Sequence, residues 1–157
     1  MNKPLVADVY KLHGDATISI PADSSLEDVI GTLIREPSLR GIFLVNSKQR
    51  LVGMVTRLDL IRWAHLNLTG GKGRHEIPIS EFFRIVDARK AKDLASGDPH
   101  VLAVRENDTL QAALDKMLDY EEDVIPVLDS EGKVSGDLRL SEVLWWVLAF
   151  GRRATQK

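Results

Sequence analysis

The sequence predicts an α+β fold in which two similar halves, each ordered strand–helix–strand–strand–helix, pack as one compact module with approximate two-fold symmetry. Three observations support this prediction. A pattern of apolar and capping residues at 20–33 returns 84 positions later, at 104–117. Each copy is followed by two short apolar runs separated by a polar turn, which is typical of a β-hairpin. A half of ~60 residues buries too little surface to be stable alone, so the halves are expected to pack together.

The first helix of each half is predicted from an amphipathic pattern. Apolar residues recur at i, i+3, i+4, i+7 and i+8 within residues 26–34 and again within 110–118. This spacing is typical of a helix with one buried face. The first helix is expected to end before Pro37, because the residue preceding a proline disfavours α geometry. The predicted N-caps are Ser24 or Ser25 for the first helix and Asp108 or Thr109 for the second.

Two apolar runs after each helix predict an antiparallel hairpin. A short polar turn separates the two runs, which favours adjacent antiparallel strands. A further helix is expected directly after each hairpin. The predicted strands are residues 42–46 and 51–55 in the first half and 125–129 and 134–138 in the second, and the predicted helices are 58–64 and 140–150.

The region between the halves is predicted to be a linker. Residues 69–74 are rich in glycine but match neither the Walker A nor the dinucleotide-binding pattern. A loop is therefore favoured over a phosphate site, and residues 79–86 are expected to add a short helix. The predicted boundaries are 1–66 for the first repeat, 67–90 for the linker, 91–150 for the second repeat and 151–157 for a basic tail.

Length and composition exclude several classes of protein. The 157 residues carry a net charge of −2 at pH 7, which is not the footprint of a nucleic-acid-binding protein. The absence of cysteine excludes disulfides and thiolate metal sites. No apolar run approaches the roughly 20 residues of a membrane span, and residues 1–5 do not begin a signal peptide. A cytoplasmic location is therefore expected.

Polar groups that suit a nucleotide occur where the second hairpin strand of the first half meets its helix. Thr56, Arg57 and Asp59 bring a hydroxyl, a guanidinium and a carboxylate to a helix start, whose N–H groups attract anions. A carboxylate also accepts hydrogen bonds from neighbouring hydroxyls such as those of a ribose. Thr56 and Asp59 equally form a capping box, and Arg57 equally belongs to a solvated helix face, so both interpretations stay open.

The repeated motifs resemble those of a pair of cystathionine-β-synthase-type (CBS) domains, the tandem unit called a Bateman module. The resemblance rests on the repeated helix starts, on the apolar strands that end in Asn46 and Asp129, and on the Gly-x-x-Thr-x-x-Asp pattern from Gly53 to Asp59. Members of this family bind adenosyl ligands between the repeats and regulate attached or partner proteins. The resemblance implies a regulatory module rather than an enzyme, with no required cofactor.

The resemblance also implies a role for each matching residue. Asp59 would accept hydrogen bonds from the ribose hydroxyls, Thr56 would hold the phosphate, and Arg57 would add charge near a polyphosphate. AMP, ADP or ATP is the expected ligand, with S-adenosylmethionine or NAD as alternatives. The adenine would be flanked by Ile42, whose backbone is expected near Thr17 and Ile18.

The second half departs from this pattern. Arg139 and Glu142 stand where threonine and aspartate are expected, and Ile125 stands at the position of Ile42. Glutamate is one methylene longer than aspartate and would require a shifted sugar, while Arg139 would fill space or reach a phosphate. We therefore expect a degenerate second site and one competent site.

The sequence contains little that indicates a metal site or a catalytic site. The four histidines are scattered and make no i, i+4 pair with one another, so no metal site is predicted. Glu121, Glu122 and Asp123 either bind a cation such as Mg²⁺ or form a solvated loop. The Gly-x-Ser-x-Gly pattern of a nucleophilic serine is absent.

Residues 143–150 would form a helix that is apolar on every side, so we expect another surface to cover it. As a helix they span only about 12 Å, too short for a bilayer. Burial against a second copy is the favoured explanation and predicts a homodimer with Trp145 and Trp146 as anchors. A membrane surface or another protein is the alternative. The two functional hypotheses are a nucleotide-sensing module that signals to an unknown protein in trans and a ligand-free assembly domain.

Overall fold

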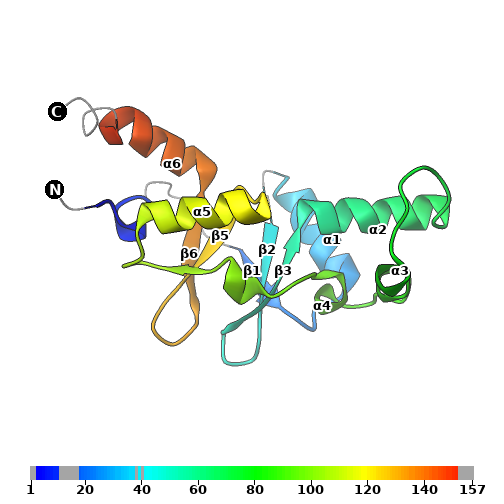
Figure 1. Ribbon diagram of the computed structural model, residues 1–157. Helices are drawn as coiled ribbons and strands as arrows, with labels where there is room; N and C mark the ends of the chain where they lie inside the picture. The colour runs from blue at the N-terminus through cyan, green and yellow to red at the C-terminus, as the bar shows by residue number, and fades with distance from the viewer. Residues whose placement is uncertain (1–2, 11–17, 38, 40, 152–157) are drawn as a thin grey trace. The chain divides into compact units, whose positions relative to one another are not determined.

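The computed structural model describes residues 3–10, 18–37, 39 and 41–151 of the chain. These residues form two compact units, each with a three-stranded sheet (Figure 1). We call them the N-half unit and the C-half unit. Among the described residues, the N-half unit comprises 18–37, 39, 41–48 and 52–99, and the C-half unit comprises 3–10, 49–51 and 100–151.

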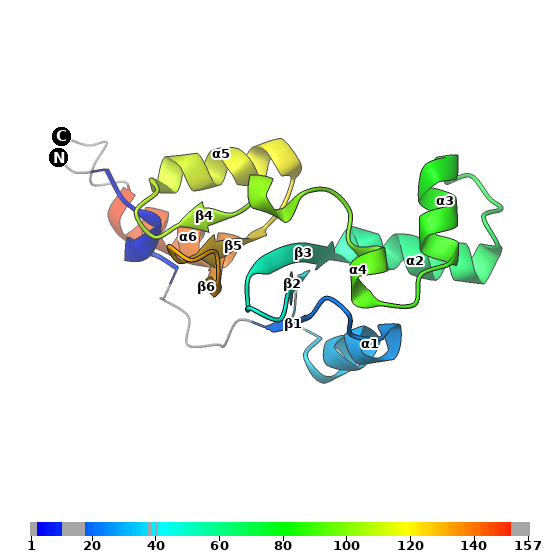
Figure 2. The same ribbon diagram turned by 90° about the horizontal axis from the view of Figure 1, so that it is seen from below.

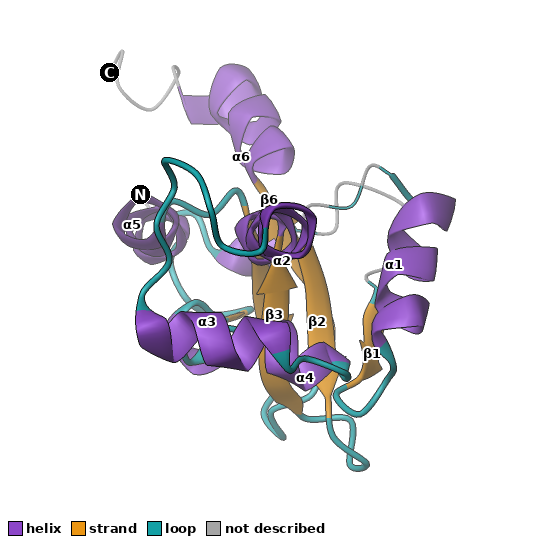
Figure 3. Cartoon of the chain, turned by 90° about the vertical axis from the view of Figure 1, so that its right-hand side faces the viewer, coloured by secondary structure: helices purple, strands orange, loops and turns teal. Residues whose placement is uncertain are grey.

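The N-half unit is built on the sheet β1–β2–β3 (Figure 3). β1 and β2 run parallel, with Ser19 opposite Phe43, and helix α1 makes the crossover that parallel neighbours require. α3 contacts both α2 and α4. The elements are β1 (Ser19–Pro21), α1 (Leu26–Arg35), β2 (Gly41–Val45), β3 (Leu51–Thr56), α2 (Arg57–Thr69), α3 (Ile79–Val86) and α4 (Ala91–Leu94).

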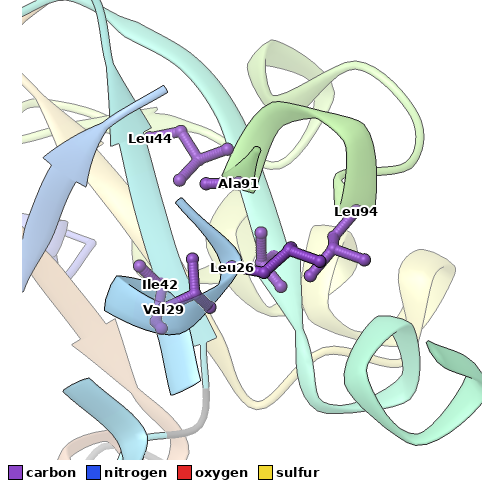
Figure 4. Close-up of a cluster of buried hydrophobic side chains, with 7 residues drawn as sticks. Leu26, Val29, Ile42, Leu44, Ala91 and Leu94 are labelled. Carbon is purple, nitrogen blue, oxygen red and sulfur yellow. The ribbon is translucent and has the colours of Figure 1, made fainter. Parts of the chain in front are cut away.

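The core of the N-half unit joins segments that are far apart in the sequence. Side chains of α1, β2, β3 and α4 meet in one buried apolar cluster (Figure 4). Burial of such side chains stabilises the fold by ~1.5–3 kcal/mol each. The short helix α4 is therefore an integral part of this unit. The buried cluster consists of Leu26, Val29, Ile42, Leu44, Val55, Ala91 and Leu94.

The C-half unit repeats the same order of elements. β4 is parallel to β5, and β5 is antiparallel to β6 with an irregularity between Val127 and Leu128. Helix α5 runs beside this sheet (Figure 2). The α+β prediction and the order strand–helix–strand–strand–helix are thus confirmed in both halves. The elements are β4 (Val104–Arg105), α5 (Leu110–Tyr120), β5 (Val124–Leu128), β6 (Val134–Arg139), α6 (Leu140–Trp146) and a π-helical turn (Val147–Gly151).

The helix boundaries confirm some predictions and extend others. Ser25 and Thr109 are the N-caps of α1 and α5, and α3 covers the predicted residues 79–86. α2 continues to Thr69 rather than ending at residue 64, because Gly70 supplies the left-handed conformation that ends it. No helix in the described part of the chain combines the length and the apolar character that a bilayer crossing requires.

The two units exchange their leading segments. In the C-half unit, the backbone N–H of Val6 donates to the carbonyl of Asp108 at 2.9 Å. In the N-half unit, the N–H of Ala91 donates to the carbonyl of Ser24 at 2.7 Å. The segment that precedes each repeat therefore packs at the first helix of the other repeat. Each repeat predicted above is one continuous stretch of sequence, whereas each compact unit is assembled from several separate stretches.

Candidate functional site

The candidate site begins at the junction of β3 and α2. The Oδ2 atom of Asp59 accepts a hydrogen bond from the backbone N–H of Thr56 at 2.9 Å. The hydroxyl of Thr56 accepts one from the N–H of Asp59 at 3.2 Å. These two bonds form the capping box that the sequence predicts. Asp59 is only 4% exposed, so its carboxylate faces the interior of the unit.

The second oxygen of this carboxylate has a distant partner. The hydroxyl of Ser96 donates to Oδ1 of Asp59 at 2.8 Å, across 37 positions of sequence. Sequence reasoning missed Ser96 because no local pattern links it to Asp59. Residues 91–94 resemble the start of the second repeat, so the sequence suggested no contact with the first. Asp59 is therefore a buried carboxylate whose two oxygens have different kinds of donor.

The segment around Ser96 is held by packing and by an arginine. Leu94 is buried in the core, and Arg84 Nη1 donates to the carbonyls of Asp93 and Ala95 at 2.7 and 3.2 Å. Gly53 on β3 faces this segment, and a Cβ there would lie 3.5 Å from the Cβ of Ala95, an ordinary van der Waals distance. A side chain at this position would also meet Leu44 Cδ1 at 3.2 Å, which is tight for a packed core.

The predicted adenine-flanking residues lie at the same end of the sheet as Thr56. The N–H of Phe43 donates to the carbonyl of Ile18 at 3.4 Å, which brings the backbones of Ile18 and Ile42 together. A Cβ on Gly41 would lie 3.5 Å from the carbonyl oxygen of Val55, so the start of β2 lies beside the end of β3. The Ile42 side chain itself is buried in the core. Thr17 lies outside the described residues.

Two further residues of the predicted site differ in exposure. Thr56 is half-buried, whereas Arg57 is exposed at the first position of α2. A helix start carries partial positive charge, and the guanidinium adds to it. The junction therefore presents positive charge to solvent beside a buried carboxylate.

The corresponding junction of the C-half unit has different chemistry. Arg139 Nε donates to Asp137 Oδ1 at 3.2 Å, and both Asp137 and Glu142 are buried. Glu142 Oε1 accepts the backbone N–H of Arg139 at 3.0 Å, so this half of the capping arrangement is kept. The guanidinium has no acceptor for the N–H of Glu142. Ile125, at the position of Ile42, is completely buried.

Two residues of the acidic run after α5 have structural roles through their backbone groups. Glu121 ends α5 in a left-handed conformation with φ of 54°, and the carbonyl of Asp123 accepts the N–H of Leu140 at 2.9 Å. Within residues 3–10, 18–37, 39 and 41–151, no three side chains of the metal-binding types gather in one place.

The C-terminal helix presents apolar side chains to solvent. Leu144, Trp145 and Leu148 are 59%, 60% and 60% exposed. Trp146 instead packs on Phe150, with ring centroids 5.6 Å apart. The predicted anchors Trp145 and Trp146 therefore differ: the first is exposed and the second is partly covered by its own helix.

Comparison with known proteins identifies the fold. A crystal structure of a CBS domain-containing protein from Thermotoga maritima matches with a TM-score of 0.76 and 23% identity, over 95% of this chain and 97% of that one. CBSX2 from Arabidopsis thaliana, in complex with AMP, matches with a TM-score of 0.68 and 22% identity, over 94% and 98% of the two chains. At these identities the likeness shows the fold alone.

Sequence comparison gives the family. The protein MJ1004 of Methanocaldococcus jannaschii is 29% identical over 125 residues, which are 80% of this chain and 49% of that protein. The chain thus spans about half the length of this relative. The family model described as CBS domain matches residues 1–66 and 91–149, well over half of the chain. Because both copies of the repeat match that model, the chain belongs to the CBS domain family.

Proposed function

We propose that this chain is a regulatory module that binds an adenosyl ligand of the AMP, ADP or ATP class at the start of α2 and signals to a partner protein. Membership of the CBS domain family supports a binding role. The similar protein CBSX2 was crystallised with AMP, which supports an adenosyl ligand. S-adenosylmethionine and NAD carry the same adenosyl group and stay as alternatives.

The observation that carries this proposal is the arrangement of Asp59. A buried carboxylate is costly unless its oxygens accept hydrogen bonds. One oxygen is satisfied by the backbone N–H of Thr56, and the other accepts a side-chain hydroxyl. The second oxygen is thus set up to accept a neutral O–H group, and a ribose hydroxyl is such a group.

The rest of the ligand would extend from this carboxylate in two directions. The phosphate would lie at the start of α2, where the Thr56 hydroxyl and the exposed guanidinium of Arg57 add to the N–H groups of the first turn. The adenine would lie beside the backbones of Ile18 and Ile42, at the same end of the sheet. We propose Thr17 as a further neighbour on the basis of sequence.

We expect one competent site in each chain. In the C-half unit, Arg139 replaces the threonine and is paired with the buried Asp137. A ligand phosphate would have to compete with this internal carboxylate for the guanidinium. Glu142 also carries its carboxylate one methylene further from the backbone than Asp59 does.

Signalling requires the ligand to bind one arrangement of the module more tightly than another. We propose that the protein that receives this signal is a separate chain. We also propose that the module pairs as a homodimer through α6 and the π-helical turn that follows it. The exposed Trp145 and Leu148 would be covered by a second copy, which would remove apolar surface from water.

A thermal-shift series with AMP, ADP, ATP, S-adenosylmethionine and NAD tests the ligand. At 100 times its dissociation constant, a ligand that binds only the folded state adds about 2.7 kcal/mol to the free energy of unfolding. Asp59→Ala is expected to remove this gain. Glu142→Ala is the matched control, because it removes the equivalent buried acid from the C-half unit and should leave the gain intact.

Two outcomes would contradict the proposal. The first is that none of the five compounds stabilises the wild-type chain. The second is that Asp59→Ala keeps the same ligand-induced gain as Glu142→Ala. Either outcome, together with self-association that Trp145→Glu abolishes, would favour the ligand-free assembly domain instead. The exposed apolar side chains of α6 are the observation that supports this second candidate.

A further inference from the structure

The contact between Ser96 and Asp59 differs from the other hydrogen bonds at the start of α2. The bonds between Thr56 and Asp59 join residues three positions apart and belong to the capping box itself. Ser96 comes from the segment after α4, and its hydroxyl reaches the other carboxylate oxygen. Loss of the Ser96 contact would therefore leave the bonds of the cap in place.

A serine hydroxyl and a ribose hydroxyl are chemically equivalent donors to this oxygen. Each is a neutral O–H group with a rotatable hydrogen, and each makes a charge-assisted bond to a carboxylate. An exchange of one hydroxyl for the other keeps Oδ1 of Asp59 satisfied. It avoids the free-energy cost of leaving a buried acceptor without a donor.

The local structure allows Ser96 to leave while its neighbours stay. Before it, Leu94 is buried and the carbonyl of Ala95 is held by Arg84 at 3.2 Å. After it, Gly97 has φ of +71°, a conformation that glycine adopts without strain. Ser96 is itself exposed. The Ser96 side chain can therefore rotate away from Asp59, and its hydroxyl can then form a hydrogen bond with water instead.

We infer that Ser96 is an internal substitute for the ligand: its hydroxyl occupies the position on Asp59 that a ribose hydroxyl takes, and binding displaces it. This inference rests on the proposed function. Ser96 then lowers the affinity for every ligand that needs Oδ1 of Asp59.

Titration calorimetry with AMP on Ser96→Ala tests the inference. The variant should bind AMP about three- to tenfold more tightly than the wild type, where tenfold corresponds to about 1.4 kcal/mol. Its ligand-free form should be less stable, while its AMP-saturated form should match the saturated wild type. Ser96→Thr, which keeps a hydroxyl, should behave like the wild type. Ser80→Ala, at an exposed serine on α3, is the matched control and should change neither quantity.

A ligand without the ribose hydroxyls separates displacement from a general effect. 2′,3′-Dideoxyadenosine monophosphate cannot replace Ser96 at the carboxylate, so Ser96→Ala should not improve its binding. Unchanged or weaker AMP binding by Ser96→Ala overturns the inference, and so does an equal gain with the dideoxy compound. If the wild type binds AMP, such a result leaves the proposed function standing. If neither protein binds AMP, both fail.

Discussion

The starts of α2 and α6 show the same backbone arrangement with different side-chain chemistry. In each, a buried acid three residues into the element accepts the N–H of the residue before the helix, at 2.9 Å for Thr56 and 3.0 Å for Arg139. In the N-half unit a threonine completes the cap and a serine hydroxyl satisfies the acid. In the C-half unit an arginine takes the threonine position and pairs with Asp137.

This difference distinguishes the structural role of the buried acid, which caps the helix, from its proposed role in ligand binding. The buried acid occurs at both helix starts and satisfies a backbone donor at both, so its presence alone does not indicate a ligand. The neutral donor of the N-half unit can be exchanged for another hydroxyl. The ion pair of the C-half unit has no such substitute in an uncharged sugar. We therefore expect ligand competence to depend on the groups around the acid.

The largest effect is expected from moving the C-half carboxylate into the N-half unit. Met54 is the buried counterpart of Asp137, and Met54→Asp would bury a charge without a guanidinium beside it. We expect a loss of about 3–5 kcal/mol in the free energy of unfolding. Adding Thr56→Arg should restore part of this loss in urea denaturation. No recovery in the double variant would show that the two junctions are not equivalent.

A smaller effect is expected from removing the buried acids. Asp59→Ala and Glu142→Ala each leave a backbone N–H without its partner, and we expect each to lose about 1–3 kcal/mol. Asp59→Ala also removes the acceptor of Ser96. Urea denaturation of Asp59→Ala, Ser96→Ala and the double variant measures this part of the loss, and the double variant should lose less than the sum of the single variants. Additive losses would indicate that the Ser96 contact contributes nothing to stability.

The N-caps of the first helices should differ little between the halves. The hydroxyl of Ser25 accepts the N–H of Asp28 at 3.2 Å, and that of Thr109 accepts the N–H of Ala112 at 3.1 Å. Ser25→Ala and Thr109→Ala should each cost about 1 kcal/mol. A Ser25→Asp variant is the control, since aspartate also caps helices and should keep stability. If only one of the two alanine variants lost stability, the first helices of the two halves would not be equivalent.

The smallest effect is expected from pH through Asp93. Hydrogen bonds from the backbone N–H groups of Arg89 and Lys90 lower the pKa of this carboxyl below its ordinary value, against a smaller opposing effect of burial. The ionised form therefore stabilises α4 above the unfolded pKa of about 3.9. This contribution is lost as pH falls through the depressed folded value.

Urea midpoints at pH 6 and pH 3 measure this contribution. The wild type should lose more stability between the two pH values than Asp93→Asn does. Asp115→Asn, at an exposed position of α5, is a control that should behave like the wild type. An equal loss in wild type and Asp93→Asn would rule out Asp93 as a source of acid sensitivity.

The parts of the fold that depend on local patterns could be predicted from the sequence. Apolar spacing and hairpin turns identify the strands and helices, and the capping box at Thr56 follows from two residues three positions apart. The end of α2 was missed because the first and second repeats differ after residue 64, and Gly70 sets the end. Ser96 was missed because its contact with Asp59 depends on how α4 packs, which no local pattern encodes.

The exchange of leading segments has a consequence for the order in which the chain matures during synthesis. Every partner within the N-half unit has left the ribosome once residue 99 has emerged. The C-half unit must wait, because Val6 hydrogen-bonds to Asp108, which is synthesised 102 residues later. Contacts of such long separation form slowly. Val6 is therefore synthesised long before its native hydrogen-bond partner, and until Asp108 emerges the segment around Val6 lacks that contact and is exposed to aggregation.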